Sequence, residues 1–178
     1  MRWLIVAACF WCGLYPAVAG PGTLQDFVDR YHCEVTARLQ ILYGKDKSTE
    51  PRDRFISINA KTHLDRYVQC LFEDDNSSVL CEVASGYFSA KAGQPRRFSL
   101  DQAGREKIKA FGFSDDDSKG NFRQIVGVKG EANLPVLARM MLSVLYEAYG
   151  VDLKSELDIR APLATLGRAR TAACSPRS

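Results

Sequence analysis

A predicted β-hairpin near the middle of the chain constrains the fold more than any other feature. Two strand-like segments, residues 66–72 and 79–84, flank a short polar stretch of Asp, Asn and Ser that favours a turn. If the turn is symmetric, residue n pairs with residue 151 − n. Because strand side chains alternate between two faces, this register gives one wholly apolar face, which is expected to meet the core. Its members are Val68, Cys70, Phe72, Val79, Cys81 and Val83.

The opposite face of the hairpin is a candidate binding face. It would consist of Tyr67, Gln69, Leu71, Leu80, Glu82 and Ala84. Tyr and Leu on a solvent-side face suit a contact surface for a peptide or a protein. The alternative is that a further element or a partner subunit covers these residues as part of a core. An Asp substitution at Leu71 or Leu80 distinguishes a binding face from a core, because the substitution should unfold the monomer only if the residue lies in a core.

The first 19 residues have the features of a secretory signal. A positive start at Met1-Arg2 precedes an apolar run over residues 3–15, and Ala17-Val18-Ala19 matches the small-residue cleavage pattern. The run is shorter than the roughly 20 apolar residues of a transmembrane helix. We therefore expect a periplasmic or secreted protein without stable membrane insertion after cleavage. Retention of the segment as an anchor is the alternative.

Four cysteines follow the signal segment: Cys33, Cys70, Cys81 and Cys174. An even number in an exported chain favours disulfides, with three ways to pair them. The hairpin register places Cys70 opposite Cys81, close enough to bridge, and leaves Cys33 with Cys174 as the second candidate pair. Two buried free thiols in the hairpin are the alternative. The spacings of 37, 11 and 93 residues match no zinc motif.

Helical periodicity accounts for most of the remaining chain. A capping box at Thr23 and Asp26 predicts a helix that ends at Gly44, and Ser99 begins a second box whose helix should close at Gly112. A third helix is expected over 134–149, and residues 55–58 and 122–128 are strand-like. The order α-β-β-β-α-β-α predicts an α+β fold with helices packed on an antiparallel sheet. We expect a single domain over residues 20–154 and a loosely ordered tail over 155–178.

The sequence offers no constellation for catalysis or metal binding. A Cys–His pair needs spatial contact and an orienting third group, and His32 and Cys33 point in different directions on a helix. His63 is expected to face solvent. The acidic run that begins at Asp115 lacks the far acidic ligand of a calcium loop. A formal net charge of +3 is too small to favour nucleic acid. We therefore predict no enzyme, cofactor or metal site.

The ordered apolar and turn positions resemble the YbjN-like domain of the type III secretion chaperone-like superfamily. The residues that carry this resemblance are Arg66-Tyr67-Val68-Gln69, Leu80-Cys81-Glu82-Val83-Ala84-Ser85, Leu100, Phe111-Gly112-Phe113, Asn121-Phe122, Leu137-Ala138 and Leu145-Tyr146-Glu147-Ala148-Tyr149-Gly150-Val151. The resemblance covers about residues 24–151. It implies non-catalytic peptide or protein binding, often by dimers.

Two further functions stay open at this point. One is an inhibitor or immunity-type protein that blocks an exported enzyme, since this needs only a complementary surface. The other is a small thiol enzyme, which requires a reactive thiol at Cys33 or Cys81.

Overall fold

Five antiparallel strands form one sheet in the computed structural model, in the order β4-β3-β2-β1-β5. The elements are α1 (Leu24–Tyr43), β1 (Phe55–Ala60), β2 (His63–Phe72), β3 (Ser78–Val83), η2 (Tyr87–Ser89), α2 (Gln102–Ala110), β4 (Phe122–Gly127), η3 (Glu131–Asn133), α3 (Leu134–Tyr149) and β5 (Leu157–Arg160). The structure describes residues 22–45, 53–73, 76–89, 95–167, 170 and 174. The predicted signal segment, residues 1–19, lies outside them.

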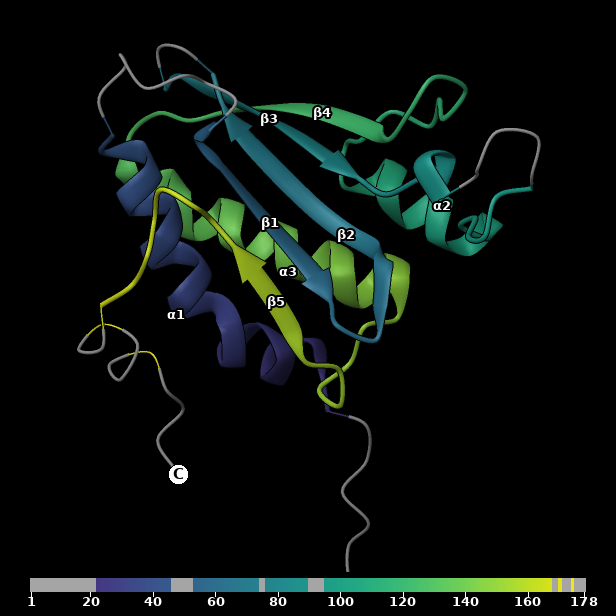
Figure 1. Ribbon diagram of the computed structural model, residues 1–178, viewed down its shortest axis with the longest axis horizontal. Coiled ribbons are helices and arrows are strands. Elements are labelled where there is room, and N and C mark those ends of the chain that lie inside the picture. The colour runs from purple at the N-terminus through teal and green to yellow at the C-terminus, as the bar shows by residue number, and fades with distance from the viewer. Residues whose placement is uncertain are drawn as a thin grey trace, which may run out of the picture.

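The two long helices pack on the same face of the sheet. Figure 1 shows α3 passing behind β1 and β2, with α1 beside it and α2 at the end of the sheet where β2 begins. The opposite sheet face carries no helix among the residues described (Figure 1). The α+β fold predicted from the sequence is therefore confirmed. None of the helices in the described part of the chain is long and apolar enough to cross a bilayer.

The helix ends follow from local side-chain chemistry. Thr23 and Asp26 form the predicted capping box, in which Asp26 N donates to Thr23 Oγ1 at 3.2 Å and Thr23 N donates to Asp26 Oδ2 at 2.8 Å. Gly150 ends α3 in the left-handed region at φ 64°, which glycine adopts without steric cost. The prediction for α2 is wrong in one respect. Asp101, not Ser99, caps it, because the Asp101 carboxylate accepts from Gly104 N at 2.8 Å.

The predicted hairpin register is confirmed. Cys70 lies opposite Cys81 and the other pairs of β2 and β3 also sum to 151. β1 and β4 pair on either side, so the apolar face of the hairpin is continuous with buried side chains of both neighbours. These side chains meet α1 and α3 in one core. Its strand members include Ile56, Ile58, Val68, Cys70, Phe72, Val79, Cys81, Val83 and Phe122.

The expectation of a loosely ordered tail from residue 155 is wrong for residues 157–160. These residues form β5, which pairs antiparallel with β1 from Ser57↔Arg160 to Ala60↔Leu157. Ala161 and Ala164 beyond it are buried. A strand of four residues shows little alternation, and its partner lies about a hundred residues earlier, so local sequence patterns carry no signal for it.

Candidate functional site

Apolar side chains form a row across the open face of the sheet. The strand registers place four of them side by side, one from each of β1 to β4: Phe55, Leu71, Leu80 and Ile125. We call these residues the apolar row. The first three are half-buried, whereas Ile125 on the edge strand is 67% exposed. With strands about 4.8 Å apart, the row is roughly 14 Å long.

A polar row runs beside the apolar row on the same face. The registers align Ser57, Gln69, Glu82 and Arg123. Glu82 accepts from Gln69 Nε2 at 2.7 Å and from Arg123 Nε at 2.7 Å, so its charge is compensated within the row. A cavity of about 270 Å³ lies where the two rows meet, lined by Phe55, Gln69, Cys70, Leu71, Leu80 and Glu82. This cavity can take an apolar group without leaving an unpaired charge beneath it.

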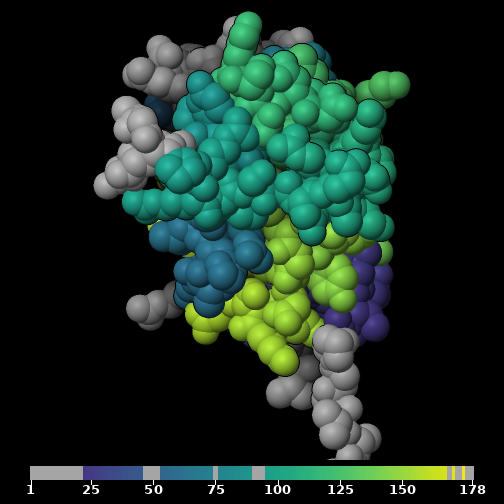
Figure 2. Space-filling view, turned by 90° about the vertical axis from the view of Figure 1, so that its right-hand side faces the viewer, coloured from purple at the N-terminus to yellow at the C-terminus, as the bar shows by residue number. Residues whose placement is uncertain are grey.

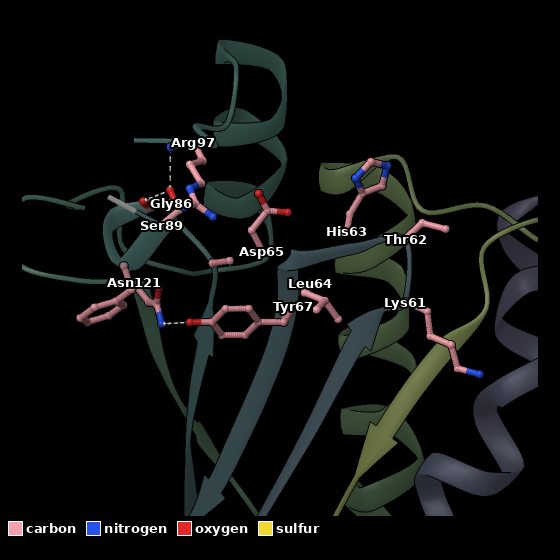
Figure 3. A pocket seen from close by; sticks show the side chains of 12 residues that line it. Lys61, Thr62, His63, Leu64, Asp65, Tyr67, Gly86, Ser89, Arg97 and Asn121 are labelled. Atoms are coloured by element: carbon pink, nitrogen blue, oxygen red, sulfur yellow. Dashed lines mark hydrogen bonds between the residues drawn. The ribbon is translucent and has the colours of Figure 1, made fainter. Parts of the chain in front are cut away.

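A larger pocket of about 720 Å³ lies at the end of the sheet where β2 begins. Tyr67 and Ala84 of the candidate binding face line it, and they join side chains from the β1–β2 turn, from the segment after β3 and from the start of β4 (Figure 3). This end of the molecule faces the viewer in Figure 2. There the blue residues of the β1–β2 turn lie beside the yellow-green α3–β5 segment and below the teal segment that follows β3.

Tyr67 and Asn121 form a polar pair in the larger pocket. Asn121 Nδ2 donates to the Tyr67 hydroxyl at 2.8 Å, as Figure 3 shows. Burial raises the pKa of Tyr67 above its ordinary value, which already leaves a tyrosine hydroxyl protonated at neutral pH. Ala84 is only 2% exposed, which makes it part of the pocket floor and not a projecting contact. Its carbonyl accepts from the Tyr149 hydroxyl at 2.5 Å, which ties this floor to α3.

The rim of the larger pocket carries charge. Lys61 is held by Glu156, with Nζ and Oε2 2.8 Å apart. Arg97 has no ion-pair partner among the described residues. The wall that bears Arg97 is fixed nearby, because the neighbouring Arg96 binds Asp117 at 2.5 Å. Arg105 binds the same carboxylate at 2.7 Å.

The structure brings the four described cysteines together in the two candidate pairs. The Sγ atoms of Cys70 and Cys81 lie 2.05 Å apart, and those of Cys33 and Cys174 lie 2.07 Å apart. Ala84 N donates to Tyr67 O, so the alternating ladder makes Cys70–Cys81 a non-hydrogen-bonded pair, the kind with the closer Cα atoms. Their Cα–Cα distance is 4.1 Å. In this arrangement neither Cys33 nor Cys81 has the free thiol that a thiol enzyme would need.

The two histidines lie in different parts of the molecule. His32 Nε2 is 2.8 Å from the carbonyl oxygen of Pro135, on the helical side of the molecule. His63 lines the larger pocket at the opposite end of β2 from Cys70. Within the described ranges, no group of three or more His, Cys, Asp or Glu side chains is placed to hold a metal ion.

A family model covers most of this architecture. Residues 46–162 match the model described as T3SS (YopN, CesT) and YbjN peptide-binding chaperone 3, or TY-Chap3. The chain belongs to the TY-Chap3 family. The resemblance drawn from the sequence is thus confirmed, and the matched range extends past residue 154 to include β5. Comparison with curated proteins and comparison with solved structures gave no match.

The sequence predicted six residues of the open face and missed others that line the same face or the larger pocket. The hairpin pattern found Tyr67, Gln69, Leu71, Leu80, Glu82 and Ala84, and the structure divides them between the two cavities. It missed residues that only non-local registers or loop packing bring to the open face or to the larger pocket. These are Phe55, Leu64, Phe88, Arg97, Asn121 and Ile125. The strand pattern of 55–58 was a usable signal for Phe55, but it did not fix the register of β1 against β2.

Proposed function

We propose that this TY-Chap3 protein is an exported, non-catalytic module that holds an extended peptide segment on the open face of its sheet. The observation that carries the proposal is the apolar row, which leaves Leu71 and Leu80 half-buried above a cavity with no covering element among the described residues. The family description supports a peptide as the bound partner.

The dimensions of the apolar row suit an extended chain. Alternate side chains of a strand are about 6.8 Å apart, so the roughly 14 Å row takes three of them on one face of a bound segment. The neighbouring Glu82 is already compensated by Arg123, so the face gains little from a particular ligand charge there. Burial of apolar side chains therefore supplies most of the affinity, and this surface should accept many apolar sequences.

Export is the second part of the proposal. The signal-like segment supports it, and the two cysteine pairs at bonding distance suit an oxidising compartment. N-terminal sequencing of the protein secreted by an expressing bacterium should give Gly20 as the first residue. A protein that stays in the cytoplasm with Met1 intact would contradict this part.

Single Asp substitutions on the open face test peptide binding. The probe is fluorescently labelled, reduced and carboxymethylated α-lactalbumin, a permanently unfolded chain, and affinity is measured by fluorescence anisotropy. Leu71→Asp and Leu80→Asp should each weaken binding at least 10-fold, because each places a charge in the apolar row. Val136→Asp is the matched control, since Val136 is a 65% exposed apolar residue on α3.

The outcomes separate a binding face from a core. Circular dichroism should show that Leu71→Asp and Leu80→Asp remain folded. Folded variants that bind like the wild type would refute the proposal. Loss of folding would show that the apolar row is a covered core surface, which also refutes it.

A further inference from the structure

We propose that the larger pocket recognises the backbone N–H and C=O of one residue of the bound peptide through Asn121 and Tyr67. We further propose that it accepts an apolar side chain next to these groups and an acidic group beside Arg97. This inference rests on the proposed function and specifies how one end of the peptide is held. It assigns a role to the pocket that the apolar row does not cover.

The Tyr67–Asn121 pair offers one donor and one acceptor to a ligand. The Tyr67 oxygen accepts from Asn121 Nδ2, and its own O–H has no acceptor among the described residues. Asn121 is 6% exposed and lines the pocket, and its Oδ1 has no donor in the same part of the chain. The N–H and C=O of a single trans amide point in opposite directions, whereas the N–H and C=O of one residue in an extended peptide point to the same side. One such residue therefore complements this pair whatever its side chain is.

Hydrogen bonds within the sheet hold both Asn121 and Tyr67 in place. Ser85 Oγ donates to the carbonyl of Gly120 at 2.6 Å, which anchors the residue before Asn121 to the end of β3. Tyr67 belongs to β2, whose backbone bonds to Ala84. Both members of the pair are thus held by the sheet before a ligand arrives, which lowers the entropic cost of binding.

Apolar surface flanks the pair. Leu64 and Phe88 both line the pocket and each is 66% exposed, unusually high for large apolar side chains. In Figure 3, Leu64 lies in front of the strands beside Tyr67. A ligand side chain next to the recognised N–H and C=O would bury this surface, so an apolar residue is favoured at that position.

The charged side chains at the rim of the pocket determine which ligand group is favoured beside the apolar one. In Figure 3 the Arg97 side chain lies at the pocket rim on the same side as Asp65, and its guanidinium has no ion-pair partner among the described residues. Lys61 on the other side is already bound to Glu156. Arg97 is therefore the cation free to bind a carboxylate, and it favours an acidic side chain or a C-terminal carboxylate in the ligand. Asp65 also lines the pocket and would repel a carboxylate on its own side, so we expect the acidic group to bind directly at Arg97.

The test uses peptides from the same unfolded probe. Ten-residue peptides that tile α-lactalbumin are screened, and the tightest binder is remade with one backbone N–H at a time replaced by N–CH₃. One methylation should weaken binding to the wild type about 3- to 10-fold, the worth of one net hydrogen bond. The same methylation should have no effect on Asn121→Ala, which lacks the acceptor.

Side-chain variants complete the test. Tyr67→Phe should weaken the unmodified peptide about 3- to 10-fold. Tyr87→Phe is the matched control, since Tyr87 lies on the same segment as Phe88 but outside the pocket lining. Arg97→Gln should weaken an Asp-containing peptide but not its Asn analogue.

Failure of this inference is distinguishable from failure of the proposed function. If binding depends on Leu71 and Leu80 but Tyr67→Phe matches Tyr87→Phe and no single N-methylation matters, only the pocket assignment is refuted. If no peptide binds the wild type, both are refuted.

Discussion

The two cysteine pairs should contribute very different amounts to stability. The Cys33–Cys174 bond would close a loop with a sequence separation of 141, and the Cys70–Cys81 bond one of 11. In the chain-entropy model, cross-links of these lengths destabilise the unfolded state by about 5 and about 2.8 kcal/mol at 25 °C. The Cys33–Cys174 bond, which we call the terminal bond, should therefore stabilise the fold more than the Cys70–Cys81 bond, which we call the hairpin bond. This holds although the hairpin bond lies in the buried core.

Comparing each variant with and without reductant measures the effect of its one remaining disulfide, because the cavity left by the substitution is present in both conditions. Cys70→Ala/Cys81→Ala keeps only the terminal bond, and Cys33→Ala/Cys174→Ala keeps only the hairpin bond. Each variant is unfolded in urea with and without reductant, and the slope is fitted separately because reduction expands the unfolded chain. The loss on reduction should be about 5 kcal/mol for the first variant and about 3 kcal/mol for the second. Equal or reversed losses, or no effect of reductant, would refute the reasoning.

Two further predictions concern charged groups inside the fold. Arg54 is fully buried, and its Nη1 donates to Asn76 Oδ1 at 2.5 Å. Asn76→Gly should therefore lower the free energy of unfolding by about 3 kcal/mol in the wild type, because it leaves a buried charge without its acceptor. In Arg54→Met no such charge is present, so the same substitution should cost only about 1 kcal/mol. A urea double-mutant cycle measures this coupling, and additive losses would contradict it. Burial raises the pKa of Asp117, but hydrogen bonds from Arg105 and Arg96 outweigh it and hold the pKa below its ordinary value. Its stabilisation is therefore present above the unfolded pKa near 4 and is lost as pH falls through the lower folded value. Asp117→Asn should cost about 1–2 kcal/mol at pH 7 and progressively less below pH 4, whereas a pH-independent cost in thermal unfolding would argue against the ion pairs.

Local pattern predicted the elements whose signals lie within a few residues. Alternation on both sides of a short turn was enough to pair Cys70 with Cys81, because a hairpin register depends only on the turn. The capping box at Thr23 and the left-handed Gly150 likewise marked helix ends from adjacent residues. At α2 the capping-box pattern that begins at Ser99 predicted the wrong cap, because the side chain that caps this helix is that of Asp101.

Long-range pairing explains what the sequence did not predict. The open face becomes a row only when β1 and β4 pair on either side of the hairpin, and their registers are set by core packing over long connections. The larger pocket unites the β1–β2 turn with Arg97 and Asn121, which are distant in sequence. Arg54 had no sequence signal at all, since nothing local distinguishes a buried arginine from a surface one.

Site-specific photo-cross-linking tests the central claim most directly. Leu80 is replaced by p-benzoylphenylalanine, and the exposed Val136 on α3 is replaced in the same way as the matched position. Each protein is irradiated with carboxymethylated α-lactalbumin. Binding on the open face predicts cross-links from position 80 and few from position 136. Equal cross-linking from both, or cross-linking only from position 136, would contradict the claim that the open sheet face holds the peptide.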